Sequence, residues 1–301
     1  METAEETAEE KYFRLQRAYW LQVAETEGFD LEHVVVPPSM IGRINGLIAY
    51  DCERYVDHYP HRMLVKHYAN VGLHRYNMLK RTNFHLGSLK KFNMLQNFVS
   101  SYYMTLLAHD LRSCPSGKDF QVRVDERTYG SLDLTVSVAR PKDELVTTKM
   151  PFIPHFHGGA SASGIFIGDL PDWPSDDDLK DQNRFYLVKE ADMQYNNWIL
   201  MYLELVICAA DRSINRYSRL SGLNIVEVVI ETTDVLPPKR RLKAKCANVY
   251  ISFTGISELH APQQVFPSGV NLKRQAIVRR VMDDTGYFTL VGKLCGGEKK
   301  E

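Results

Sequence analysis

Alternation of apolar and polar residues is the feature that most constrains the fold of this chain. Between residues 120 and 125 apolar side chains occupy every second position, and the same period returns between residues 132 and 138. Successive side chains of a β-strand point to opposite faces, so this pattern is typical of strands that bury one face. Tyr129 and Gly130 separate the two segments. The sequence therefore predicts an antiparallel hairpin whose apolar face must be covered by other elements.

A long amphipathic helix is predicted before this hairpin. From His61 to Arg81 the apolar residues recur at offsets of three and four, which places them on one helical face. Gly72 lies in the middle of this segment, where glycine costs about 1 kcal/mol relative to alanine. We expect a close approach to a sheet to compensate. Segments Phe84–Leu95 and Val99–Leu107 are rich in aromatic and branched residues and supply two further strands.

The same order of elements returns in the second half of the chain. Arg184–Lys189 is typical of a strand, and a helical stripe through Trp198 and Val206 begins near Asp192, a residue type that caps helices. Four strand-like segments follow, namely Leu223–Glu231, Leu242–Thr254, Lys273–Met282 and Gly286–Lys293. Proline and glycine interrupt every period between Pro141 and Pro174, which indicates a long connection.

We therefore predict an α+β protein of two similar units. Each unit would have a strand and a long helix followed by a four-stranded antiparallel sheet, with the two sheets side by side or merged into one. The predicted divisions are an acidic tail, amphipathic helix and loop (1–44), a first unit (45–142), a connecting segment (143–183), a second unit (184–295) and a tail (296–301).

Charge and cysteine content exclude several classes of protein. Lys plus Arg number 37 and Asp plus Glu number 37, so no net field draws the chain to nucleic acid or to an anionic membrane. The 5 cysteines are scattered, which indicates reduced thiols. The N-terminus lacks the apolar core of a secretory signal, and the longest apolar run, Trp198–Ala210, is shorter than the roughly 20 residues of a membrane span. We expect a cytoplasmic or nuclear protein.

Several short stretches together resemble a known group of sequences. Asn70–Asn77 reads Asn-Val-Gly-Leu-His-Arg-Tyr-Asn and is similar to the helix signature of plant cystatins. Together with Val-Ala-Arg-Pro-Lys at 138–142, Arg-Leu-Lys-Ala-Lys at 241–245 and Ala-Ile-Val-Arg-Arg at 276–280, it resembles an uncharacterised plant-specific family. That family is grouped with the cystatin/monellin superfamily, and its name is linked to embryo development. The resemblance implies two cystatin-like units.

Cystatin function does not follow from this resemblance. Cystatins block papain-like proteases with a Gln-x-Val-x-Gly loop and a Pro-Trp loop. The nearest stretch here is residues 96–100, in which Phe98 stands at the valine position and Ser100 at the glycine position, and the chain has no Pro-Trp pair. Glycine allows backbone geometry that other residues resist, so its loss argues against inhibition.

Motifs of catalysis and metal binding are weak. His155 and His157 would point to one side of an extended segment, but no third ligand lies nearby, and we favour a solvated loop. Residues 159–163 end in serine, where the nucleophile elbow of hydrolases requires glycine. Asp176–Asp178 follow Ser175 and are typical of a helix start. We expect no catalytic residue, metal or cofactor.

One dense basic segment is the candidate functional feature. It contains Lys239, Arg240, Arg241, Lys243 and Lys245 within residues 237–245. Such a run is typical of a nuclear localisation signal or a phosphate-binding strip, and equally of a turn that leads into a strand with solvated lysines. We favour the turn, and the net charge of zero argues against a nucleic-acid partner.

The leading functional hypothesis is a non-enzymatic protein-interaction module for an unknown protein partner, with a role in plant or embryo development implied by the resemblance. The alternatives are a cysteine-protease inhibitor of cystatin type and a ligand-binding enzyme of cystatin-like fold. A deep polar cavity would favour the enzyme.

Overall fold

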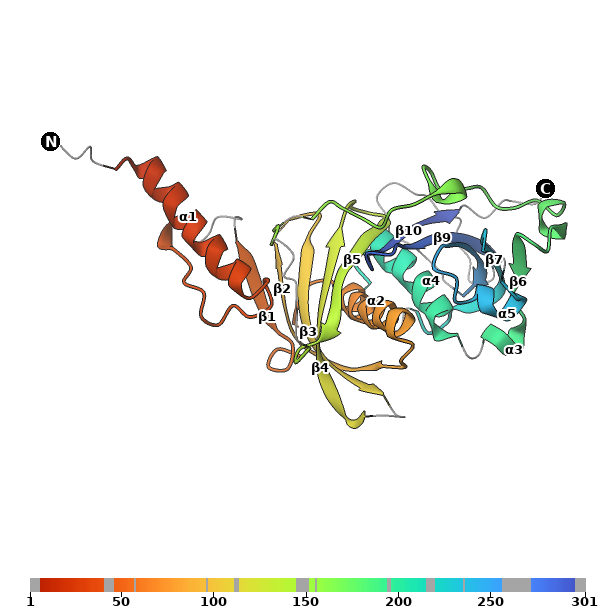
Figure 1. Ribbon diagram of the computed structural model, residues 1–301, viewed down its shortest axis with the longest axis horizontal. Helices are drawn as coiled ribbons and strands as arrows, with labels where there is room; N and C mark the ends of the chain where they lie inside the picture. Colours follow the sequence, from red (N-terminus) through yellow and green to blue (C-terminus); the bar gives the residue numbers. More distant parts are fainter. Residues whose placement is uncertain are drawn as a thin grey trace.

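The computed structural model describes residues 6–40, 46–56, 58–95, 97–110, 114–144, 152–154, 156–193, 196–214, 220–234, 236–255 and 272–295. Its centre is one antiparallel sheet of ten strands in the order β1-β2-β3-β4-β5-β10-β9-β8-β7-β6 (Figure 1). The tail predicted at 296–301 and parts of the connecting segment predicted at 143–183 lie outside the described residues.

The first half of the sheet comprises β1 (Leu47–Asp51), β2 (His85–Leu95), β3 (Ser101–Asp110), β4 (Cys114–Glu126) and β5 (Leu132–Pro141). The second half comprises β6 (Phe185–Leu187), β7 (Asn224–Glu231), β8 (Ala247–Thr254), β9 (Arg274–Met282) and β10 (Phe288–Cys295). The helices are α1 (Ala8–Glu25), α2 (Arg62–Lys80), α3 (Glu190–Met193), α4 (Asn197–Ala210) and α5 (Pro238–Arg241), with 3-10 turns at Pro38–Met40, Gly164–Phe166 and Asp178–Lys180.

The predicted fold class, two cystatin-like units that each have their own four-stranded sheet, is wrong. β5 pairs with β10 in antiparallel register, from Phe288 opposite Val136 to Gly292 opposite Leu132, and this joins all strands into one sheet. Both strands are largely buried and neither carries a proline in its centre. Because an unpaired edge in a buried setting would leave backbone groups unsatisfied, the two edges satisfy each other.

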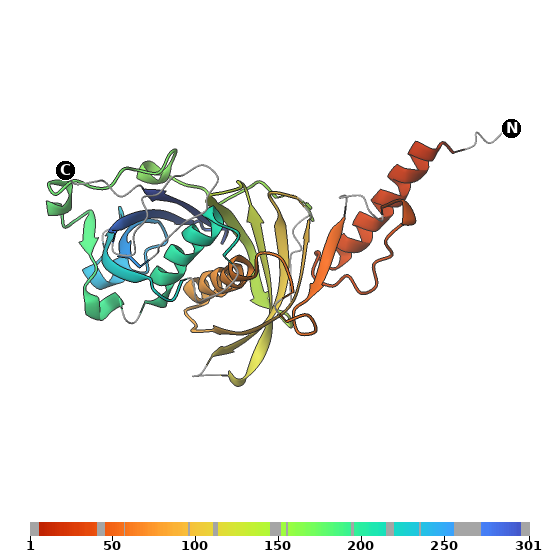
Figure 2. The same cartoon turned by 180° about the vertical axis from the view of Figure 1, so that it is seen from behind.

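Helices α2 and α4 lie together on one face of the sheet, across the β5–β10 seam (Figures 1 and 2). Their apolar faces and the strands beneath form one hydrophobic core that includes residues of both halves. Close packing at the seam requires a glycine, since a methyl group at Gly292 would lie 2.7 Å from Val206 Cγ2 and 3.0 Å from Leu132 Cδ2. The core is therefore continuous across the seam.

The segment between β5 and β6 covers the opposite face of the sheet. Arg123 Nη2 donates to the Ile153 carbonyl at 2.6 Å, and Arg279 donates to the carbonyls of Gly168 at 2.7 Å and Asp169 at 2.6 Å. Val122 and Val124 flank Arg123 in sequence, and Val278 precedes Arg279; all three lie in the core on the helix side, which places the two arginines on the other face. This connection is thus attached along the sheet.

Helix α1 projects beyond the β1 edge of the sheet (Figure 1). Thr7 and Glu10 form a capping box at its start, and Tyr19 and Val23 are its buried residues. The Tyr19 hydroxyl accepts the backbone N–H of Leu47 at 2.9 Å, which ties α1 to β1. Within the described residues, no helix has the length and apolar content needed to span a bilayer.

Two boundaries in the second half differ from the sequence prediction. The strand predicted over Leu242–Thr254 begins only at Ala247, because α5 and a turn occupy the residues before it. The helix predicted to begin near Asp192 is two helices, and Asn196 is the residue that precedes α4. The Asp192 carboxylate instead accepts the Tyr186 hydroxyl at 3.0 Å.

The expectation that Gly72 faces the sheet is confirmed. A methyl group at Gly72 would lie 2.2 Å from Val122 Cγ1 on β4, which no side chain tolerates without movement. We expect Gly72→Ala to lower the free energy of unfolding by about 1 to 3 kcal/mol, although alanine is the better helix former by about 1 kcal/mol.

Chemical denaturation of the single and double variants checks this expectation. Val122→Ala creates space beside residue 72, so adding it to Gly72→Ala should cost less than the sum of the two single changes. A Gly72→Ala protein as stable as the wild type would contradict the close approach.

Candidate interaction surface

The basic segment folds as a short helix and a turn at the surface. Lys239, Arg240, Lys243 and Lys245 are exposed, and we call these four residues the basic surface. Arg241 is buried: its Nε donates to the Leu236 carbonyl at 3.0 Å, and its Nη1 donates to the Gln182 carbonyl at 2.6 Å. Four of the five residues singled out from sequence thus lie together at the surface, and the fifth holds the turn in place.

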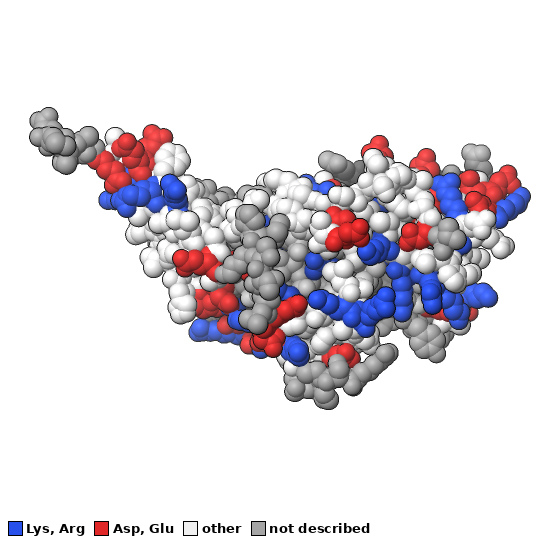
Figure 3. Space-filling model, in the orientation of Figure 1, with Lys and Arg blue, Asp and Glu red and all other residues white. Residues whose placement is uncertain are grey.

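Few carboxylates neutralise the basic surface. Lys239 pairs with Asp192 at 3.3 Å and Lys245 pairs with Asp284 at 3.0 Å. In the described part of the chain, Arg240 and Lys243 have no carboxylate within ion-pair distance. Figure 3 shows Lys and Arg gathered in a band over the region where α2 and α5 lie. The surface therefore carries excess positive charge on a chain whose net charge is zero.

A further arginine lies beneath the basic surface. Arg280 on β9 is fully buried, its Nη2 donates to the Leu242 carbonyl at 3.3 Å, and its guanidinium lies 4.9 Å from the centre of the Trp198 ring. Its Nε and Nη1 have no hydrogen-bond partner among the described residues. The buried charge is thus stabilised by an aromatic face and a backbone dipole.

Arg75 on α2 is bonded in the same way. Its Nε donates to the Gly286 carbonyl at 2.6 Å and its Nη1 to the Ala139 carbonyl at 3.4 Å. Burial lowers the pKa of Arg75 to about 10, and the charges of Asp283 and Tyr287 oppose this shift. Arg75, Arg241 and Arg280 therefore form no ion pair within the described residues and rely on carbonyl groups.

Three arginines elsewhere in the molecule have carboxylate partners. Arg123 binds Asp125 at 2.9 Å, Arg212 binds Glu126 at 3.0 Å, and Arg184 binds Glu231. A carboxylate cancels the charge of an arginine, whereas a carbonyl only solvates it. Arg75, Arg241 and Arg280 thus place uncancelled positive charge around α5 and the adjoining helix face. Arg279 places another such charge on the opposite face of the sheet, where it bonds the carbonyls of Gly168 and Asp169.

A second exposed feature lies at the ends of two hairpins. Phe98, between β2 and β3, is 77% exposed, and Tyr129, between β4 and β5, is 51% exposed. Their rings meet edge to face with 5.5 Å between centroids, and the Arg212 guanidinium lies 4.6 Å from the centre of the Tyr129 ring. We call Phe98 and Tyr129 the aromatic pair.

A buried glutamate fixes the loops that carry the aromatic pair. Glu126 accepts the Tyr68 hydroxyl at 2.7 Å, the backbone N–H of Ser100 at 3.0 Å and Arg212 Nη2 at 3.0 Å. The Ser100 hydroxyl lies 2.7 Å from the Leu95 carbonyl and 2.9 Å from that of Asn97, closing the first loop. Sequence reasoning missed Tyr129 and Arg212. The position of Tyr129, in a turn between two alternating segments, could have indicated an exposed aromatic residue. No sequence pattern predicts that Arg212 contacts Glu126.

The remaining sequence candidates do not assemble into a site. His155 lies outside the described residues, and His157 is exposed. No group of three or more potential metal ligands occurs within the described part of the chain. Ser175 and Asp178 exchange hydrogen bonds at the start of a 3-10 turn, which accounts for Asp178 within the aspartate run.

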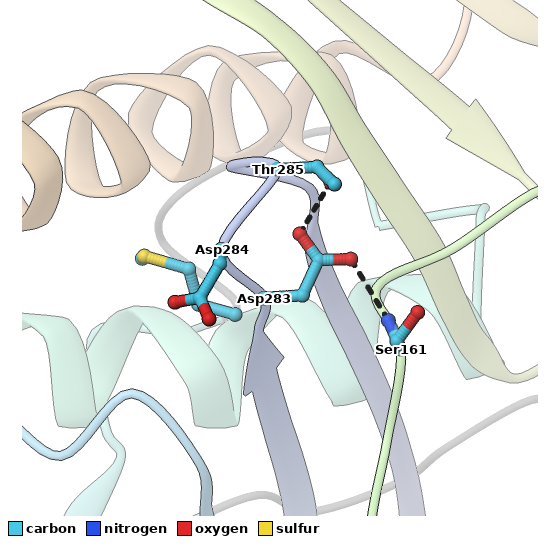
Figure 4. Close-up of a pocket in the computed structure, with 5 residues that line it drawn as sticks. Ser161, Asp283, Asp284 and Thr285 are labelled. Atoms are coloured by element: carbon cyan, nitrogen blue, oxygen red, sulfur yellow. Dashed lines mark hydrogen bonds between the residues drawn. The ribbon is translucent and has the colours of Figure 1, made fainter.

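A pocket of about 360 Å³ lies beside Ser161, at the β9–β10 turn (Figure 4). Asp283 in this turn accepts the backbone N–H of Ser161 at 2.9 Å and the hydroxyl of Thr285. The pocket is lined by Ser161 and Met282–Thr285; this set contains no histidine, and Asp283 bonds the backbone N–H of Ser161 and the Thr285 hydroxyl. The geometry gives no support to a nucleophile at Ser161.

Comparison with known proteins identifies relatives along the whole chain. UPF0725 protein At1g23960 of Arabidopsis thaliana is 56% identical over 97% of this chain and 98% of its own length. The chain belongs to the UPF0725 family. UPF0725 protein At1g23970 of the same plant is 48% identical, over 99% of this chain and 93% of its own length. The prediction of a plant family is confirmed, whereas none of these matches shows a link to cystatins or monellins.

The UPF0725 chain also matches MS5 proteins. A family model described as Protein MS5 matches residues 170–290. The crystal structure of MS5 from Brassica napus is 31% identical, covers 78% of this chain and 99% of that chain, and superimposes with a TM-score of 0.59. The superposition supports the fold.

A buried acid and a buried base face each other where α2 meets α4. His67 Nε2 lies 3.7 Å from Glu204 Oε2, and neither His67 nitrogen has a hydrogen-bond partner among the described residues. Burial raises the pKa of Glu204 to about 7, and burial together with the charge of Lys66 lowers the pKa of His67 to about 4. Both shifts favour the neutral forms at the helix interface that joins the two halves.

The Glu204 shift has a defined effect on stability. A carboxyl whose pKa is raised on folding contributes stability that is complete below its unfolded value of 4.5 and lost as pH rises to about 7. We expect the free energy of unfolding of Glu204→Gln to fall less than that of the wild type between pH 4.5 and pH 8. The difference between the two falls should be at most about 3 kcal/mol. Urea denaturation across this pH range measures the difference. Glu53→Gln, at an exposed position, is the control, and parallel curves for wild type and Glu204→Gln would contradict the shift.

Proposed function

We propose that this UPF0725 chain is a non-enzymatic protein-interaction module, and that the aromatic pair is its principal contact. The observation that carries the proposal is the exposure of Phe98 and Tyr129 on loops held by the buried Glu126 network. Large apolar rings favour burial, so two of them kept at the surface on stiff loops are costly unless a partner covers them.

The composition of this tip matches that of binding hot spots. Tyrosine and arginine are enriched among the residues that contribute most binding energy, and the Arg212 guanidinium lies over the face of the Tyr129 ring. Rigid loops lose little conformational freedom on association, which increases the affinity available from a small contact. These features support a protein partner for the tip.

The polar clusters of the chain support a non-enzymatic role. Asp125 accepts Ser101, Ser137 and Arg123, and Glu231 accepts Asn248, Tyr250 and Arg184, so both carboxylates are saturated by structural partners. Catalytic groups by contrast converge on a space that a substrate can enter. Neither cluster faces such a space among the described pockets.

A protease inhibitor of cystatin type would need a loop that enters a narrow cleft. Here the Ser100 hydroxyl and N–H are both engaged inside the protein, and Phe98 is bulkier than valine. We therefore expect no inhibition of papain at micromolar concentration, since loss of several buried anchors costs well over about 4 kcal/mol. A titration against papain with a fluorogenic peptide measures this directly. Stoichiometric inhibition would overturn the proposed function.

Site-specific photocrosslinking tests the aromatic pair. Benzoylphenylalanine placed at position 98 in plant cells should form a discrete protein adduct, and the same group at exposed position 167 should not. Tyr129→Ala should reduce the adduct at least about tenfold, because adjacent hot-spot residues act together. Thermal unfolding of each variant controls for folding. Equal labelling from positions 98 and 167, or an adduct that is insensitive to Tyr129→Ala, would count against the proposal.

A further inference from the structure

We propose that the basic surface, made of Lys239, Arg240, Lys243 and Lys245, binds an acidic segment of a partner protein, rich in aspartate and glutamate. This inference goes beyond the aromatic pair and is carried by different residues. Its basis is an excess of positive charge that is built into the fold at two depths, exposed side chains above and buried guanidinium groups beneath.

The exposed layer is held in a fixed arrangement. Arg241 anchors α5 through three carbonyl groups, and Leu242 and Ala244 are buried, so the basic residues alternate with residues fixed in the core. A nuclear localisation signal is recognised as an accessible run of basic side chains. Here the central Arg241 is not accessible. The folded segment is therefore a shaped surface and not a linear signal.

The buried layer strengthens the field above it. Arg280 bonds the carbonyl of Leu242, a residue within the basic segment itself, so its charge lies directly under the basic surface. A charge in a low-dielectric interior is screened less than one in water, and its field emerges where the covering layer is thin. Arg241 contributes in the same way from within the turn. An anionic group at this surface thus meets more positive charge than the exposed residues alone provide.

An acidic peptide fits the surface better than a nucleic acid does. Asp192 and Asp284 stand beside Lys239 and Lys245, and a dense row of phosphates would be repelled by them. Nucleic-acid binding draws most of its affinity from many phosphate contacts, and four exposed cations, two of them already paired, offer few. A segment with spaced carboxylates can meet Arg240 and Lys243 and leave the existing pairs intact. Arg240 can also bind a carboxylate with two hydrogen bonds.

Fluorescence anisotropy with a labelled deca-glutamate peptide tests the inference on the full chain at about 150 mM NaCl, where long-range attraction is screened. Lys239→Glu, Arg240→Glu and Lys243→Glu together should weaken binding at least about tenfold, since charge reversal adds repulsion to the loss of contacts. The control reverses three exposed cations elsewhere, Arg54, Lys180 and Lys273, with the same change in net charge, and should change affinity less than about twofold.

The buried layer has its own readout. Arg280→Met removes a charge that no peptide can touch and should weaken peptide binding about two- to fivefold, whereas Arg280→Lys should restore it. A purely structural role for Arg280 would alter thermal stability and leave the affinity unchanged. Equal binding by the surface-reversed and control variants would overturn the proposal. So would duplex DNA or phosphatidylserine vesicles that bind more tightly than deca-glutamate under the same conditions.

Discussion

The pairing of β5 with β10 is the constraint on which the rest of the molecule depends. It closes two edges that would otherwise expose backbone groups in an apolar setting, and it brings α2 and α4 onto one face. Contacts between the two halves follow from this pairing. His74 on α2 lies 3.1 Å from the Tyr202 hydroxyl on α4, and Arg75 reaches the β9–β10 turn. Neither half could bury these groups alone.

The sequence identified elements well and their assembly poorly. Period and composition located α2 and the strands around it, and they identified Gly72 as a point of close approach. Alternation reports which face of a strand is buried but does not report which strand lies beside it. The edges of β5 and β10 carry no central proline, which is a weak signal that they are covered. Gly292 was a second signal, since its lack of a side chain admits Val206 at the seam.

The candidate surfaces were only partly accessible to sequence reasoning. The basic run Lys239–Lys245 can be recognised from the sequence alone. That Arg241 is buried and anchors the turn, while its basic neighbours are exposed, is apparent only from the structure. Phe98 was noticed as a departure from the cystatin pattern, yet its neighbour Tyr129 lies on another hairpin. Arg212 and Glu126 are joined only when the two halves of the sheet merge. Contacts between residues so far apart in the chain produce no periodic pattern in the sequence, so they cannot be predicted from it.

The buried arginines of this molecule are stabilised in two different ways. On the face covered by the connection between β5 and β6, Arg123 meets a carboxylate, whereas Arg279 meets two carbonyl oxygens and the Asn248 amide oxygen. Around α5, Arg241 and Arg280 meet carbonyl oxygens, which stabilise a guanidinium through dipoles but cancel none of its charge. A chain with balanced totals of acidic and basic residues therefore presents a positive face. The charges that balance this face lie elsewhere on the chain, and a bound acidic segment of the kind proposed would supply carboxylates to it in a fixed arrangement.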